Sequence, residues 1–239
     1  MKMSRLFMLL LFAAIAMNAQ VRSAKIIYER KTNLYKKWKH ESNIERWIKE
    51  EDKIKTDFFE MYVTDTFSVF QPQESDLREQ YAWATSKNTV YQDFQHNNRY
   101  MVKTMWGEEL HLTDSLYDRT WHISEGTRKI AGYHCRKAVW RANDSTRVYA
   151  WFSYDIVPST GPESFNGLPG TILGLATEDG GVVYFAKKVE ILKPEPSVFV
   201  PPKKKKKVYN TPELKKLLTE KYGHEKWFPY EMREHFGIW

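Results

Sequence analysis

The sequence is poor in cysteine and in long apolar runs, and both shortages exclude whole classes of protein. Cys135 is the only cysteine among 239 residues, so the chain forms no internal disulfide and no cysteine-rich zinc site. After residue 19, no apolar stretch approaches the roughly 20 residues that a membrane-spanning helix needs. Apolar residues nevertheless make up 42% of the chain and aromatic residues 15%, which is typical of a folded domain and not of a disordered chain.

The body of the chain also lacks an excess of either charge. Residues 20–201 hold 25 basic and 25 acidic side chains, whereas residues 202–239 hold ten basic and five acidic ones. The net charge of +7 therefore comes from the two ends of the chain. A nucleic-acid-binding domain carries its basic surface on the fold itself, so the sequence predicts no nucleic-acid partner.

Residues 1–19 have the pattern of a signal peptide. Lys2 and Arg5 precede an apolar run from residue 6 to residue 16, and small residues follow it. The run is too short to cross a bilayer as a helix and has the length of a signal-peptide core. We expect cleavage after Ala19 and a mature protein that begins at Gln20 and is exported to the periplasm or the outer membrane.

From residue 20 to residue 192 the pattern predicts one antiparallel β domain. Short segments rich in β-branched and aromatic residues alternate with turn residues, and no long helix separates them. About ten such strands favour a curved sheet or an open barrel, because so many cannot remain flat. The expected strands cover residues 25–32, 54–63, 67–70, 89–94, 99–106, 109–113, 119–124, 129–141, 146–156, 171–177 and 182–192.

Several local features refine this prediction. Residues 178–181 contain an Asp-Gly pair, which is typical of a tight turn, and should close the final hairpin. Glu125-Gly126 and Asn143-Asp144 are expected turns between strands. Residues 41–53 predict either a short amphipathic helix or an ordered loop. Their apolar residues have the spacing of one face of a helix, but they form only one short stripe.

Residues 193–239 are expected to form a linker and an aromatic helical tail. Prolines and the run Lys203, Lys204, Lys205, Lys206 and Lys207 make the first part extended and solvated, and the run could contact anionic lipid. Thr211-Pro212 predicts a helix start and Gly223 a helix end, with an apolar stripe of Leu214, Leu217 and Leu218 between them. The aromatic end should dock either on the body or on a partner.

A glycine-rich loop links the chain to a known family. Residues 167–173 read GLPGTIL, residues 129–138 read KIAGYHCRKA, residues 151–159 read WFSYDIVPS and residues 181–189 read GVVYFAKKV. Together these segments resemble the GLPGLI family of exported Gram-negative envelope proteins, with Thr171 where the family signature has leucine. The resemblance implies export, a β-rich fold and an accessory role beside an outer-membrane complex or transporter; it implies no reaction.

Two functional hypotheses follow. The first is a non-catalytic envelope accessory or binding protein without a cofactor or metal, whose candidate partner-binding residues are Leu168, Pro169, Trp227, Phe228, Phe236 and Trp239. The alternative is a metal- or redox-handling protein that uses Cys135 with His134, His96, His111 and His122. Strand alternation favours the first, because it places His134 and Cys135 on opposite faces. We identify no catalytic residue, and consider an enzyme less favoured than a binding protein.

Overall fold

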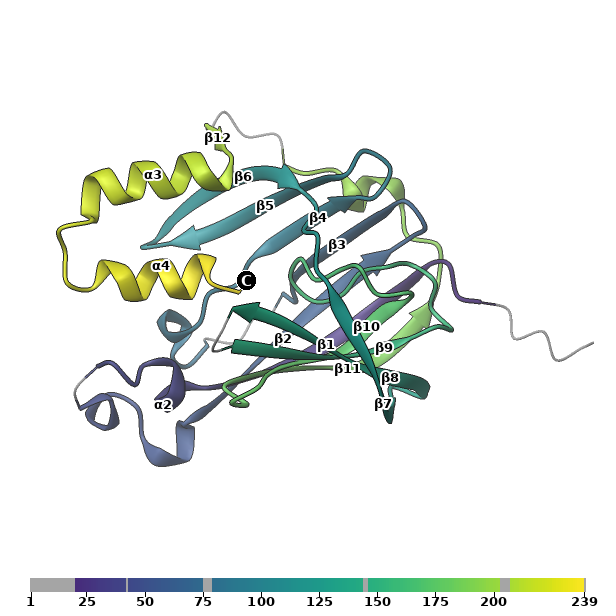
Figure 1. The fold of residues 1–239 in the computed structure, drawn as a ribbon, viewed down its shortest axis with the longest axis horizontal. Coiled ribbons are helices and arrows are strands. Elements are labelled where there is room, and N and C mark those ends of the chain that lie inside the picture. Colours follow the sequence, from purple (N-terminus) through teal and green to yellow (C-terminus); the bar gives the residue numbers. More distant parts are fainter. Residues whose placement is uncertain (1–19, 42, 75–78, 144–145, 203–206, 239) are drawn as a thin grey trace, which may run out of the picture.

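The strands form one sheet that spans nearly the whole described chain. The computed structural model describes residues 20–41, 43–74, 79–143, 146–202 and 207–238; the expected signal peptide lies outside these residues. Within them, twelve strands form an open sheet in the order β12-β6-β5-β4-β3-β2-β1-β11-β10-β9-β8-β7 (Figure 1). Their bounds are β1 (Ala24–Asn33), β2 (Ile54–Val63), β3 (Phe67–Pro72), β4 (Thr89–Asp93), β5 (Asn98–Met105), β6 (Glu108–Ser115), β7 (Trp121–Ile130), β8 (Tyr133–Asn143), β9 (Thr146–Ser153), β10 (Thr171–Thr177), β11 (Val182–Ile191) and β12 (Val208–Tyr209). The predicted mainly β fold is therefore confirmed.

The sheet is antiparallel except at one edge, where β12 runs parallel to β6. β1 lies inside the sheet and pairs with both β2 and β11, so it joins the two halves of the body. Its alternate residues Ala24, Ile26 and Tyr28 are fully buried, which is the period expected when one face of a strand packs on a core. The final hairpin turns where we expected, because the Gly180 amide donates to the Thr177 carbonyl at 2.9 Å.

Two sequence-based expectations differ from the structure. Glu125 and Gly126 do not form a turn: they lie within β7, where the register shifts between Ile123 and Thr127. The turn comes later, at Ala131-Gly132, where both residues have positive φ angles of 48° and 91°. The expected strand 129–141 is therefore two strands, because a bulge absorbs the glycine that we took for a turn.

Residues 41–53 adopt the loop alternative. Two short 3₁₀ turns, Ile44–Arg46 and Glu50–Asp52, replace a continuous helix, because Asn43 is left-handed and Lys49 is extended. Ile48 is fully buried, while Trp47 is 73% exposed. Two further 3₁₀ turns cover Ala82–Ala84 and Pro196–Phe199.

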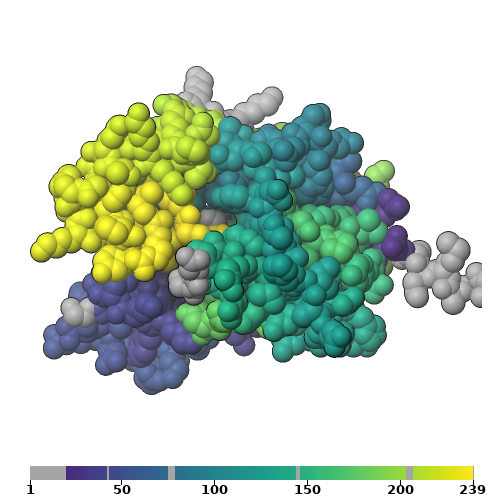
Figure 2. All heavy atoms as spheres, viewed as in Figure 1, coloured from purple at the N-terminus to yellow at the C-terminus, as the bar shows by residue number. Residues whose placement is uncertain are grey.

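The tail after residue 207 packs on the chain's own sheet. α3 (Thr211–Tyr222) and α4 (Phe228–Phe236) lie side by side at the β5–β6 end of the sheet (Figure 1). Figure 2 shows both helices in close contact with the strands and with the N-terminal region that holds α2 (Leu34–Lys37). The tail and the sheet share one apolar core, which comprises Val90, Met101, Met105, Leu112, Leu214, Leu218 and Phe228.

The start and the stripe of α3 differ slightly from the prediction. Asn210, not Thr211, caps the helix by accepting from the Glu213 amide at 2.8 Å. Thr211 instead donates its hydroxyl to Asp114 at 2.7 Å, which ties the helix to β6. Leu217 is 43% exposed and lies outside the buried stripe.

Residues 154–170, between β9 and β10, form a long and largely buried loop that supplies Phe165 and Leu168 to the main core. Gly170 has a φ of 145°, and a Cβ atom there would lie 2.0 Å from the Ser153 carbonyl oxygen. Only glycine therefore fits at this place. Of the helices described, none is long and apolar enough to cross a membrane.

Candidate functional site

The glycine-rich loop is divided between the core and the surface. Leu168 is 2% exposed and packs in the main core, whereas Pro169 is exposed. Arg119 donates to the Ser164 carbonyl at 2.9 Å and to the Asn166 side chain at 3.0 Å. The expectation that the loop presents Leu168 to a partner is therefore corrected, because Leu168 packs in this chain's own core; the expectation for Pro169 stays a prediction.

The aromatic tail residues are divided between core and surface. Phe228 is 5% exposed and packs with the apolar core beneath α3 and α4, so the chain itself covers it. Phe236 is half-buried, and the Lys103 ammonium lies 5.7 Å from its ring centre. Trp227 is 39% exposed and contacts Trp106 edge to face. Trp239 lies outside the described residues, as do Lys203, Lys204, Lys205 and Lys206 of the basic run; Lys207 pairs with Glu213 at 3.0 Å.

The residues of the metal hypothesis do not come together. Cys135 is 1% exposed, and burial raises the pKa of its thiol to about 11. His134 is exposed on the other face of β8. His111 on β6 bonds to the Tyr100 hydroxyl, and His96 bonds to Asp93 from the turn after β4; both strands are far from β8 in the sheet order. Among the described residues, no group of three His, Cys, Asp or Glu side chains could hold a metal ion.

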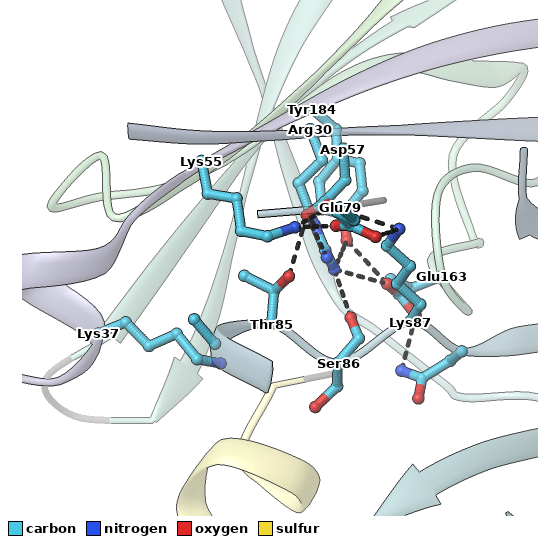
Figure 3. Close-up of polar contacts among 12 residues, drawn as sticks. Arg30, Lys37, Lys55, Asp57, Glu79, Thr85, Ser86, Lys87, Glu163 and Tyr184 are labelled. Carbon is cyan, nitrogen blue, oxygen red and sulfur yellow. Dashed lines mark hydrogen bonds and ion pairs between the residues drawn. The ribbon is translucent and has the colours of Figure 1, made fainter. Parts of the chain in front are cut away.

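The structure instead brings charged residues together beneath the sheet, in a group that we call the Asp57 cluster. It comprises Arg30 on β1, Lys55 and Asp57 on β2, and Glu79 and Lys87 on the connection between β3 and β4 (Figure 3). Arg30 donates to one Asp57 oxygen from Nε at 3.1 Å and from Nη2 at 2.6 Å, and Lys55 pairs with Asp57 and Glu79. Two carboxylates thus compensate three cations at close range.

Asp57 is strongly held in its charged form. Burial by itself opposes ionisation, but the Arg30 charge and hydrogen bonds from Lys55 and Arg30 outweigh it and hold the pKa of Asp57 well below its usual range. Thr85 adds a further hydrogen bond to the same oxygen at 3.2 Å. This carboxylate has no free lone pair facing a cleft, so we assign the Asp57 cluster a structural role.

A second polar group adjoins the cluster on the far side of Arg30. Glu163, from the buried loop, accepts from the Tyr184 hydroxyl at 2.7 Å and from the Asn88 amide at 3.0 Å. Its carboxylate lies 4.0 Å from the Arg30 guanidinium. Glu163 thereby compensates the remaining positive charge of the Asp57 cluster.

These side chains form one wall of a small cavity of about 30 Å³, which we call the inner pocket. Lys103 of β5, Asn88, and Glu234 and His235 of α4 form other parts of its wall. Three side chains, Lys37, Val182 and Glu234, line both the inner pocket and a neighbouring cleft of about 850 Å³. The ion pair of Lys37 and Glu234 therefore stands between the two spaces.

The cleft lies between the segment at 36–40, the β10–β11 hairpin and α4. His40 and Tyr230 stack on one another at its mouth, with ring centres 4.2 Å apart and nearly parallel planes. Lys36, Lys39 and Arg233 stand beside Glu178, Asp179 and Glu231, so the mouth carries both signs of charge. Aromatic surface and mixed charge are typical of a site that orients a small polar ligand.

Lys103 differs from every other lysine of this region. It is 2% exposed, and among the described residues its ammonium forms no hydrogen bond or ion pair and lies over the Phe236 ring. Burial lowers the pKa of Lys103 to about 8, with Glu163 opposing and Arg99 assisting that shift. Burial, assisted by the Arg30 charge, also lowers the pKa of Lys37 to about 7, and the Glu231 charge opposes this shift.

Sequence reasoning missed this region completely. The available signal was that three charged residues share the alternation of apolar core positions: Arg30 follows Ile26 and Tyr28 on one face of β1, and Lys55 and Asp57 precede Phe59 and Met61 on one face of β2. A charged residue at a core-facing position of a strand is unusual, because burial of an unpaired charge is costly. The pattern could have indicated buried charges, but no local rule shows that residues 30, 57, 103, 163 and 235 meet.

Comparison with known proteins supports a likeness in sequence over a short segment only. The model of a family described as "Protein of unknown function (Porph_ging)" matches residues 140–174, which run from β8 through the buried loop into β10. No curated protein matches the chain. A solved structure of PNGF-II superposes with a TM-score of 0.56 and 14% sequence identity, covering 82% of this chain and 33% of that chain. The chain therefore spans about a third of the length of that protein, and the likeness concerns the fold alone.

Proposed function

We propose that this protein is an exported, non-catalytic binding protein of the Gram-negative cell envelope, and that the cleft holds its ligand. The observation that carries the proposal is the cleft itself: about 850 Å³, with walls from three parts of the chain and a stacked aromatic pair at its mouth. Its volume is in the range of small-molecule sites. Export and the accessory role beside an outer-membrane transporter derive from the residue 1–19 pattern and the resemblance to the GLPGLI family.

The described residues of the cleft favour binding over catalysis by a serine or cysteine nucleophile. Its lining contains no serine or cysteine. The nearby Asp57 carboxylate is saturated by Arg30 and Lys55 and is therefore unsuited to proton transfer. A ligand in this cleft would be held by stacking and ion pairs.

The test is whether the protein retains a molecule in its cleft. The mature protein is purified from envelope fractions under native conditions, and the bound molecules are identified by mass spectrometry. A double variant, Lys39→Trp with Arg233→Trp, fills the cleft from two walls. A matched double variant, Lys216→Trp with Arg136→Trp, places the same residues on exposed positions of α3 and β8 away from it.

We expect wild type and the matched variant to retain the same molecule in a fixed ratio and the cleft variant to lose it, with all three equally folded. Equal retention by the cleft variant, or no retained molecule in any of the three, would overturn the proposal. Recovery of the protein only from the cytoplasm would overturn the envelope assignment.

A further inference from the structure

Three aromatic rings and one carboxylate line a hollow at the surface, apart from the inner pocket. Trp106, Tyr222, Trp227 and Glu231 surround about 350 Å³, which we call the aromatic hollow. Trp106 lies in the turn between β5 and β6, Tyr222 ends α3, and Trp227 precedes α4. Trp106 is 46% exposed and Trp227 39% exposed, so their rings remain accessible to a ligand.

The rings of the aromatic hollow meet at steep angles. The Trp106 ring centre lies 5.2 Å from that of Tyr222 and 5.4 Å from that of Trp227, with planes inclined by 70° and 77°. The Tyr222 and Trp227 centres are 5.7 Å apart and their planes are inclined by 47°. Rings at such angles form the walls of a corner and not a flat platform. The hollow therefore fits a compact, rounded group better than a planar one.

The backbone at Trp106 is strained. Met105 pairs with Glu108 across the hairpin, so Trp106 and Gly107 form a two-residue turn, with φ angles of 51° and 79°. Such a turn favours asparagine, aspartate or glycine at its first position, and a bulky residue there is an outlier. Strained residues of this kind cluster at ligand-binding sites, and the exposed Trp106 ring lies at one.

Glu231 places a carboxylate in the wall of the aromatic hollow. Its Oε2 atom accepts a hydrogen bond from Trp106 Nε1 at 3.2 Å and lies 3.3 Å from His235 Nε2. The hydrogen bond with His235 lowers the pKa of Glu231, so the carboxylate is ionised at neutral pH. Burial lowers the pKa of His235, which leaves that imidazole neutral. The nearby cations Lys37 and Lys103 offset part of the Glu231 charge, so the rings must supply most of the attraction.

The combination of ring faces and a carboxylate favours a positively charged group. Aromatic faces attract a cation within about 6 Å of the ring centre, and aromatic cages are suited to quaternary ammonium groups. A primary ammonium is compact and strongly hydrated, whereas the methyl groups of a trimethylammonium pack on the rings and leave no N–H group without a partner. The chain shows the same attraction on a small scale, because the Lys221 ammonium lies 5.0 Å from the Tyr222 ring centre.

We propose that the aromatic hollow binds a trimethylammonium group, with the rings of Trp106, Tyr222 and Trp227 around its methyl groups and Glu231 as the adjacent negative charge. Free choline and the headgroup of phosphatidylcholine both carry this group. The inference goes beyond the proposed function and does not rest on it, since Glu231 is the single residue that lines both the hollow and the cleft.

Choline is the first probe, and its neutral carbon analogue, in which a tert-butyl group replaces the trimethylammonium, is the second. Both are titrated into the full mature protein by calorimetry at constant ionic strength. We expect choline to bind at least tenfold more tightly, because the two molecules have the same shape and differ in charge. Equal affinities, or no binding of choline, would overturn the site.

Two matched variants locate the binding. Trp106→Asn removes a ring and supplies a residue that suits the left-handed turn, so the fold should be retained while choline affinity falls at least tenfold. Trp47→Asn makes the same change at a tryptophan that is 73% exposed and does not line the hollow, and affinity should not change. Equal affinity of Trp106→Asn and wild type would refute the assignment.

Vesicles distinguish the source of the group. If phosphatidylcholine vesicles sediment wild type but not Trp106→Asn, the group belongs to a lipid headgroup; if choline binds and these vesicles do not, it belongs to a free solute. Phosphatidylglycerol vesicles, which lack the group, should sediment both proteins equally. The Lys39→Trp, Arg233→Trp cleft variant should bind choline as wild type does. Loss of choline binding there would place choline in the cleft and overturn the hollow, while leaving the proposed function intact.

Discussion

The Asp57 cluster and the inner pocket adjoin one another and bury similar side chains, but they compensate charge differently. In the cluster, Arg30 and Lys55 contact Asp57 directly, and Glu79 and Thr85 complete the network. In the pocket, Lys103 is equally buried and has a ring as its neighbour. The difference shows that burial alone does not define the environment of a lysine: the charge of Lys55 is matched by the carboxylates of a hydrogen-bonded network, whereas the Lys103 ammonium has no ion pair among the described residues.

Among the substitutions considered, removal of the Asp57 charge should lower the stability of the fold the most. Asp57→Asn keeps the shape but leaves the buried charges of Arg30 and Lys55 without this carboxylate, and we expect the free energy of unfolding to fall by about 3–5 kcal/mol. Urea denaturation at pH 7 measures it. Because the folded-state pKa of Asp57 lies below its unfolded value near 4, the difference from wild type should persist down to about pH 4 and shrink as pH falls further.

Asp65→Asn is the matched control for this substitution. Asp65 pairs with Arg22 at 2.9 Å, but both side chains are largely exposed. The expected loss is under about 1 kcal/mol. Equal losses for the two variants would show that the Asp57 cluster is not a stabilising network.

Weaker packing of α4 should change the inner pocket and leave the Asp57 cluster unchanged. Phe228→Ala removes a ring that is 5% exposed in the apolar core, and a loss of about 3 kcal/mol is expected. Since α4 carries the His235 wall of the pocket, water should reach Lys103, and its pKa should rise toward the ordinary value near 10.5. NMR titration and urea denaturation measure the two effects.

Trp227→Ala serves as the comparison for Phe228→Ala, because Trp227 is 39% exposed and precedes the same helix. It should reduce stability less and leave the pKa of Lys103 in place. A rise in that pKa with Trp227→Ala, or none with Phe228→Ala, would contradict the role of α4 as the cover of the pocket.

The pH dependence of stability should reveal the uncompensated lysine. The folded-state pKa of Lys103, about 8, lies below the ordinary lysine value of 10.5, so the unfolded chain binds more protons between these pH values and stability rises with pH there. Arg99, Glu163, His235 and Lys37 are the charged and titratable neighbours that set this pKa or respond to it.

Lys103→Met should remove that rise. Compared with the variant, wild type should gain up to about 3 kcal/mol between pH 8 and pH 10, measured as a difference between parallel urea titrations. At pH 7 the variant should be as stable as wild type or more so, because an unpaired buried charge has been replaced by an apolar chain of similar length. Parallel curves across this range would refute an uncompensated Lys103.

The smallest effect should come from Thr85→Val. The substitution removes one hydrogen bond to a carboxylate that keeps several others, so we expect a loss of about 1–2 kcal/mol in urea denaturation. Thr113→Val, which removes an exposed hydroxyl bond to Asn98 at 3.1 Å, should change stability by less than about 0.5 kcal/mol. If Thr85→Val lowered the free energy of unfolding as much as Asp57→Asn, the remaining hydrogen bonds to Asp57 would not be enough to stabilise its charge.

The strands could be predicted well because they depend on local pattern. β2 and the β10–β11 hairpin lie where alternation and turn residues placed them, since residues two apart on a strand share an environment. The Glu125-Gly126 prediction was wrong because a glycine permits a bulge as readily as a turn, and only the partner strand decides between them. The helix cap was wrong by one residue because Asp114, from β6, engages Thr211.

The local sequence determined that this protein is a mainly β, aromatic-rich domain with a helix after residue 210, because period, turn chemistry and capping act over a few residues. The tertiary structure alone decided what the tail covers and which charges meet. Lys103, Glu163 and His235 are each separated by at least 60 positions along the chain. These residues come together because of the strand order of the sheet and the packing of α4 on it, and neither can be predicted from a local sequence pattern. The physical reason is that the energy of a buried charge depends on what surrounds it in space.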